Sequence, residues 1–101
     1  MTPEEKIARG RSAEALLANP LLEEALTGIK AGLLLALDVP PAESSPEMRE
    51  GIYHMLQGLR KFREALTKYV RDGNFELKMI ENAKQDAVRK AGTHVGGSGT
   101  A

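Results

Sequence analysis

A carboxylate and a histidine lie one helical turn apart at Glu50 and His54, a spacing at which two helix side chains can share a metal ion. A metal site needs a third ligand, which would have to come from a neighbouring copy of the chain. The other histidine, His94, lies in a glycine-rich stretch without a recognisable partner. We therefore interpret Glu50 and His54 as a surface pair and predict no metal site.

Catalytic patterns are absent from the rest of the sequence. Glu23 and Glu24 are adjacent, so on a helix they point in different directions and cannot form a facing acid and base pair. The chain has no cysteine, no serine in a nucleophile motif and no glycine-rich phosphate loop after a strand. We predict that the protein is not an enzyme, with no catalytic residue and no cofactor.

Basic residues are densest in one segment of the chain, where they form a candidate face for an anion or a partner. They are Arg60, Lys61, Arg63, Lys68 and Arg71. Such a face can contact phosphates, but 14 basic residues are balanced by 14 acidic ones, and no helix-turn-helix or base-stacking aromatic pattern accompanies them. The sequence favours a solvated face or ion pairs with an acidic helix over nucleic-acid binding.

These residues belong to a long amphipathic helix expected over residues 46–72. Ser45 is a good N-cap, Pro46 suits the first helical position, and Gly73 is the expected left-handed terminator. Large apolar residues follow a heptad pattern typical of a helix that packs lengthwise on another. They are Ile52, Met55, Leu59, Phe62, Leu66 and Tyr69.

A second helix is expected over residues 20–37, opened by Asn19-Pro20. The loop at 38–45, DVPPAESS, would let the long helix fold back on it. The chain is therefore predicted to be all-α, built on an antiparallel helical hairpin. Eight residues are predicted to form the hairpin core: Leu22, Leu26, Ile29, Leu33, Ile52, Leu59, Phe62 and Leu66.

The second helix also carries a line of small residues, Ala25, Gly28, Gly32 and Ala36. Each glycine inside a helix costs roughly 1 kcal/mol relative to alanine, which suggests close approach by another helix. Beyond Gly28 the helix is apolar almost all round apart from Lys30. We predict that this side of the helix contacts another copy or a partner.

Shorter segments flank the hairpin. Thr2 to Glu5 forms a capping box before a thin N-terminal helix, which Gly10 and Ser12 weaken. A further helix is expected over residues 75–91 as a C-terminal extension. Residues 1–92 are predicted to form a single helical domain, and residues 93–101 a flexible glycine-rich tail.

The composition of the chain favours self-association. The chain has 101 residues, 4% aromatic residues and no tryptophan, so a thin helical hairpin buries only a modest core. Its longest apolar run, residues 31–37, is far shorter than the roughly 20 residues of a membrane span. The acidic N-terminus has no signal-peptide core. We expect synthesis in the cytoplasm, no membrane association and a homo-oligomer.

Two segments resemble a family of small helical proteins of tailed bacteriophages and prophages. They are AEALLANPLLEEAL (13–26) and REGIYHMLQGLRKFREALTKYVRDG (49–73), joined through the Pro-containing loop. Genes of that family often lie among those for head and tail assembly, and its members are mostly uncharacterised. The resemblance implies a location in the host cytoplasm during synthesis or in the virion, and other phage structural proteins as partners. It transfers no site residues.

The favoured hypothesis is a non-enzymatic, oligomerising structural or assembly protein of a tailed phage that acts through helix–helix interfaces. The alternative is a phage-encoded binding module that sequesters or inhibits a host factor or small ligand, which an arginine-lined cavity would support. The third hypothesis is a nucleic-acid-associated packaging or regulatory protein.

Overall fold

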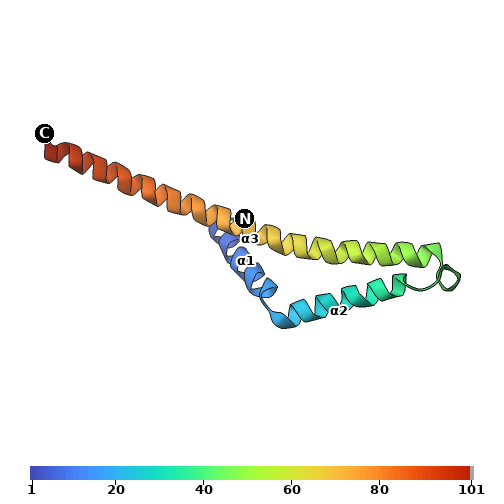
Figure 1. Cartoon of the computed structure of the whole chain (residues 1–101). Helices are drawn as coiled ribbons and strands as arrows, with labels where there is room; N and C mark the ends of the chain where they lie inside the picture. The colour runs from blue at the N-terminus through green and yellow to red at the C-terminus, as the bar shows by residue number, and fades with distance from the viewer. Residues whose placement is uncertain (101) are drawn as a thin grey trace.

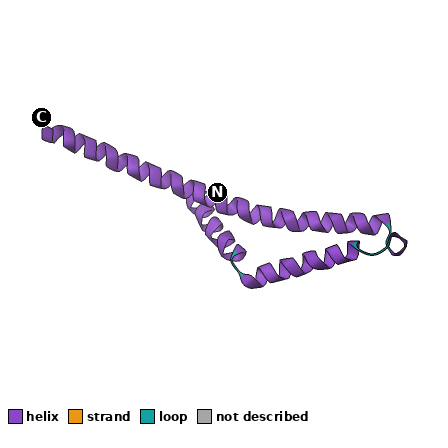
Figure 2. Cartoon of the chain, viewed as in Figure 1, coloured by secondary structure: helices purple, strands orange, loops and turns teal. Residues whose placement is uncertain are grey.

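The computed structural model describes the backbone of residues 1–100 and the side chains of residues 1–91. The fold is all-α, with the order α1 (Pro3–Leu17), α2 (Pro20–Leu37), the short 3-10 helix η1 (Pro41–Glu43) and α3 (Pro46–Thr100). α2 and α3 form an antiparallel hairpin, and α1 crosses α3 near the middle of its length (Figure 1). Loops lie between α1 and α2 and on both sides of η1, which itself lies between α2 and α3 (Figure 2).

The helices begin where the capping signals predict. The Thr2 hydroxyl accepts a hydrogen bond from the Glu5 N–H at 3.1 Å, and the Glu5 carboxylate accepts one from the Thr2 N–H at 3.3 Å. The Asn19 side chain caps α2 at 2.9 Å, and the Ser45 hydroxyl caps α3 at 3.1 Å. These bonds satisfy N–H groups that a helix start leaves without a partner.

The predicted helix end at Gly73 is wrong, because α3 continues through this residue without interruption. No glycine among the described residues has a positive φ, so Gly73 does not act as a left-handed cap. A single glycine costs a helix only about 1 kcal/mol, which good helix formers on both sides can offset. The separate helix expected over residues 75–91 is therefore the distal part of α3.

A flexible tail is expected over residues 93–101, and the structure does not describe the side chains of these residues. Ala101 lies outside the described residues altogether. That expectation stays a prediction.

Arg49 holds the loop between α2 and α3 in place. Its Nε donates to the Ser44 hydroxyl at 2.8 Å, and its Nη2 donates to the Val39 carbonyl at 3.0 Å. Both bonds tie the first turn of α3 to the segment that leaves α2. The turn that reverses the chain is thus fixed by a residue of the helix that follows it.

The molecule is an extended rod with a small core. It measures 88 × 25 × 23 Å, and its radius of gyration is 23.9 Å, against about 13 Å for a compact domain of 100 residues. Among the described residues, the buried hydrophobic side chains are Ala13, Leu26, Ile52 and Leu66. Many large apolar side chains of the hairpin are instead exposed to solvent.

Candidate interaction surfaces

α1 and α3 make the tightest helix contact in the molecule, at two glycines. A Cβ atom built on Gly10 would lie 2.8 Å from the Tyr69 carbonyl oxygen and 3.1 Å from the Gly73 Cα. One built on Gly73 would lie 3.0 Å from the Lys6 carbonyl oxygen and 3.2 Å from the Gly10 Cα. The two backbones approach this closely only because neither residue has a side chain.

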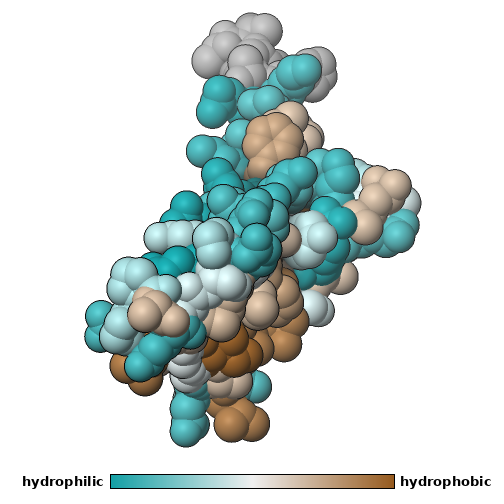
Figure 3. Space-filling view, turned by 90° about the vertical axis from the view of Figure 1, so that its right-hand side faces the viewer, coloured by the Kyte–Doolittle hydropathy of each residue, from teal (hydrophilic) through white to brown (hydrophobic). Residues whose placement is uncertain are grey.

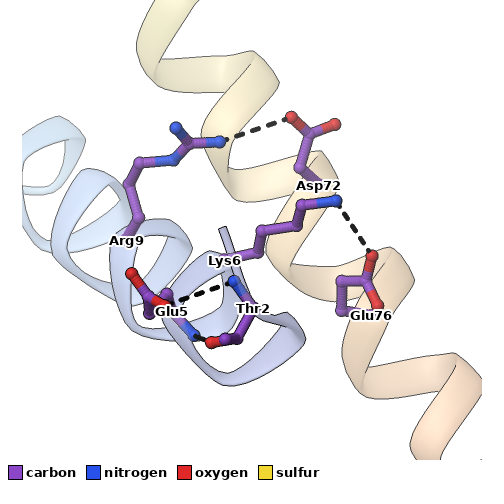
Figure 4. A network of polar contacts seen from close by, with 6 residues as sticks. All are labelled: Thr2, Glu5, Lys6, Arg9, Asp72 and Glu76. Carbon is purple, nitrogen blue, oxygen red and sulfur yellow. Dashed lines mark hydrogen bonds and ion pairs between the residues drawn. The ribbon is translucent and has the colours of Figure 1, made fainter.

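Two ion pairs also join α1 to α3, and Figure 4 shows both of them. The Lys6 ammonium lies 3.4 Å from the Glu76 carboxylate, and the Arg9 guanidinium lies 3.8 Å from that of Asp72. Arg9 also lies over the Tyr69 ring, 4.1 Å from its centroid. These contacts orient α1 on α3, while the Arg9 Nε is buried without a hydrogen-bond partner.

α2 contacts α3, but only part of the predicted hairpin core is buried between the two helices. Leu26, Ile52 and Leu66 are buried, and Leu22, Leu33 and Leu59 are half-buried. In contrast to the prediction, Ile29 and Phe62 remain 52% and 44% exposed. The reason is that α2 lies at an angle to α3 (Figure 1), so the two helices are not packed along their whole width.

An ion pair joins the start of α2 to the middle of α3. The Arg63 guanidinium donates two hydrogen bonds to the Glu23 carboxylate, at 2.9 and 3.0 Å. These hydrogen bonds lower the pKa of Glu23 and raise the pKa of Arg63. Both groups are exposed to water, so the pair orients the helices more than it stabilises them.

An apolar groove of about 410 Å³ lies on one flank of the hairpin. It includes Ile29 and Phe62, the two predicted core residues that stay exposed, and Met55, which is 57% exposed. The full lining is Leu26, Ile29, Leu33, Met55, Gly58, Leu59 and Phe62.

A cationic groove of about 280 Å³ lies on another flank, also between α2 and α3. Leucines form its apolar part, and three basic side chains line it as well. The full lining is Leu26, Lys30, Leu34, Leu56, Leu59, Arg60 and Arg63. Arg63 is paired with Glu23, whereas Lys30 and Arg60 form no ion pair with another described residue.

The outer stripe of α2, defined as Leu21, Ala25, Gly28, Gly32 and Leu35, faces away from α3. Leu21 and Leu35 are each 71% exposed. A Cβ atom on Gly28 or Gly32 would meet nothing within 4 Å. Seen end-on from the loop side, the hydrophobic surface gathers in the lower part of the molecule, where α2 lies (Figure 3). Among the residues that the structure describes, nothing packs on these glycines.

The remaining predicted site residues are dispersed. Ala36 is half-buried beside the outer stripe, Arg63 faces α2, and Arg60, Lys61, Lys68 and Arg71 are exposed on α3. Glu50 and His54 lie 3.9 Å apart on the surface. No group of three or more potential metal ligands occurs among the described residues.

The sequence analysis missed the glycine crossing because it treated Gly10 as a weak point of α1 and Gly73 as a helix end. One signal was available. Gly10 and Ala13 are small residues three apart on the same face of α1, and Ala13 is only 2% exposed. That face marks the side of α1 that packs closely on another helix.

None of the described helices has both the length and the apolar character needed to cross a membrane. Comparison of the chain with protein-family models, with curated proteins and with solved structures finds no match.

Proposed function

We propose that the protein is a non-enzymatic, self-associating helical protein whose copies meet through the outer stripe of α2. The observation that carries this proposal is the exposure of an apolar helix face, with Leu21 and Leu35 each 71% open to solvent. Exposed contiguous apolar surface in a soluble protein usually marks an interaction site.

The outer stripe has the spacing of a helix–helix interface. Its five residues, Leu21, Ala25, Gly28, Gly32 and Leu35, are separated alternately by four and three positions, as in a heptad repeat. The glycines at its centre leave room for a second backbone to approach closely, and the leucines at its ends supply apolar area.

The outer stripe is also suited to pairing with itself. Leu21 and Leu35 are equidistant from Gly28 in the sequence, so a two-fold axis at Gly28 would place Leu21 of one copy beside Leu35 of the other. Such an antiparallel pair uses the same surface on both copies, which is the commonest arrangement in homo-oligomers. A role in head or tail assembly of a tailed bacteriophage, with other phage structural proteins as partners, follows from the sequence resemblance.

The proposal is tested by the mass of the variant Gly32→Leu in solution. A Cβ at this position would meet no described atom within 4 Å, so the variant should keep its helicity by circular dichroism. Between two copies, the leucine would prevent the backbones from approaching, and the oligomer should dissociate.

Gly51→Leu is the matched control, because Gly51 lies on α3 and a Cβ there also meets nothing within 4 Å. It should keep the mass of the natural chain. An unchanged oligomer in Gly32→Leu would contradict close packing at the outer stripe.

A further inference from the structure

We propose that the cationic groove binds an amphipathic anion, namely a single alkyl chain that ends in an acidic group such as a carboxylate. The groove combines two features that such a molecule needs. Leu26, Leu34, Leu56 and Leu59 provide an apolar surface for the chain, and Lys30 and Arg60 provide positive charge for the head group.

Two of the three positive charges of this groove are not neutralised by an ion pair with any described residue. Arg63 is engaged by Glu23 through two hydrogen bonds, but Lys30 and Arg60 make no ion pair with another described residue. Glu64 follows Arg60 by one helical turn without pairing with it. Two cations that line one groove from opposite helices therefore remain available to an anionic ligand.

The size of the groove limits the ligand. Its volume of about 280 Å³ lies just below the range of roughly 300–1,000 Å³ that is typical of small-molecule sites. One unbranched chain of medium length fits such a space better than a bulky or multi-chain lipid does. The Glu23–Arg63 ion pair joins the two helices beside the groove and keeps both walls in position.

The cationic groove is separate from the outer stripe of α2. Two positions along a helix correspond to a turn of about 200°, so Lys30 lies opposite Gly28, and Leu34 lies opposite Gly32. Ligand binding and self-association therefore use different sides of α2, and each can be measured without removing the other.

Titration calorimetry of the full chain with decanoate tests this proposal, with decyltrimethylammonium as the ligand of opposite charge. We expect saturable binding of decanoate, at one molecule per chain, and markedly weaker binding of the cation. Lys30→Gln and Arg60→Gln should each weaken decanoate binding about tenfold, since each removes one charge-assisted contact.

Lys61→Gln and Lys68→Gln are the matched controls, because these lysines are exposed on α3 and do not line the groove. Both should bind decanoate as the natural chain does. Equal affinity for the two ligands, or unchanged decanoate binding in Arg60→Gln with normal helicity, would overturn the proposal. A natural chain that does not bind decanoate would also overturn the proposal. If Arg60→Gln then changed the mass of the oligomer, the groove would be a contact site for a second copy of the chain.

Discussion

Individual glycines decide how closely the helices of this protein approach one another. At Gly10 and Gly73 the backbones of α1 and α3 are in contact, and a Cβ on either residue would meet backbone atoms at 3.2 Å or less. A Cβ on Gly28 or Gly32 would instead meet no described atom within 4 Å. The first pair therefore supports the fold of one chain, and the second pair is available to another molecule.

Gly10→Ala should destabilise the fold, because its methyl group would meet the Tyr69 carbonyl oxygen and neither helix backbone can move freely. We expect a loss of about 1–3 kcal/mol in the free energy of unfolding. Gly51→Ala, where the methyl group meets nothing within 4 Å, should instead stabilise α3 by roughly 0.5–1 kcal/mol. Urea unfolding followed by circular dichroism, at one fixed protein concentration, compares the two. Equal stability of both variants would contradict the close contact at Gly10.

The Glu23–Arg63 ion pair should make hairpin stability depend on pH. The pKa of Glu23 lies below its ordinary value of 4.5 in the folded chain, so the unfolded chain binds a proton first as the pH falls. The stabilisation is therefore present above pH 4.5 and is lost as the pH falls through the lower pKa of the folded state.

Glu23→Gln should slightly lower the melting temperature at pH 7 and leave it unchanged at pH 2.5, relative to the natural chain. Glu24→Gln is the control, since Glu24 makes no ion pair with another described residue. A deficit of Glu23→Gln that persists at low pH would show that the ion pair is not its cause.

Among the elements, α3 is the one on which the others are assembled. It contacts α1 at the glycine crossing, and it contacts α2 along the hairpin, where Arg63 pairs with Glu23. The start of each helix was predictable from Thr2, Asn19 and Ser45, because a cap is a local interaction that needs no tertiary information.

The continuation of α3 through Gly73 was not predictable in the same way. A glycine after an amphipathic segment has the same local pattern whether it terminates the helix or admits a crossing helix. The structural role of Gly73 depends on its contact with α1. α1 lies far away in the sequence, and the sequence did not predict where it packs on α3. For the same reason, the sequence placed Ile29 and Phe62 in the hairpin core and could not show that they stay exposed, since the angle between α2 and α3 is set by the whole fold.

Continuity of α3 through Gly73 can be measured with two spin labels. The chain has no cysteine, so cysteines introduced at Lys61 and Lys84 can be labelled selectively. A continuous helix should separate these positions by about 35 Å, at about 1.5 Å per residue. Labels at Glu47 and Lys68, which both precede Gly73, provide the control for an uninterrupted segment. Dilution with unlabelled protein removes distances between copies, and a markedly shorter Lys61–Lys84 distance would contradict a continuous α3.

As a whole, the molecule is a rod whose hydrophobic surface is not enclosed by its own fold. A chain of 10.9 kDa that extends over 88 Å has few side chains far from water, and large apolar residues are exposed both on the hairpin and on the distal part of α3. The all-α class and the hairpin could be predicted from periodicity and loop composition. The extended shape could not, since it depends on how far α3 projects beyond α1.

Self-association is best measured by light scattering behind a sizing column, across a hundredfold range of concentration. Light scattering gives the mass independently of shape, which matters because a rod elutes earlier than a compact protein of the same mass. We expect a discrete oligomer, with a mass that is an integral multiple of 10.9 kDa and that falls only at the lowest concentrations. A mass of 10.9 kDa at every concentration would contradict self-association through α2.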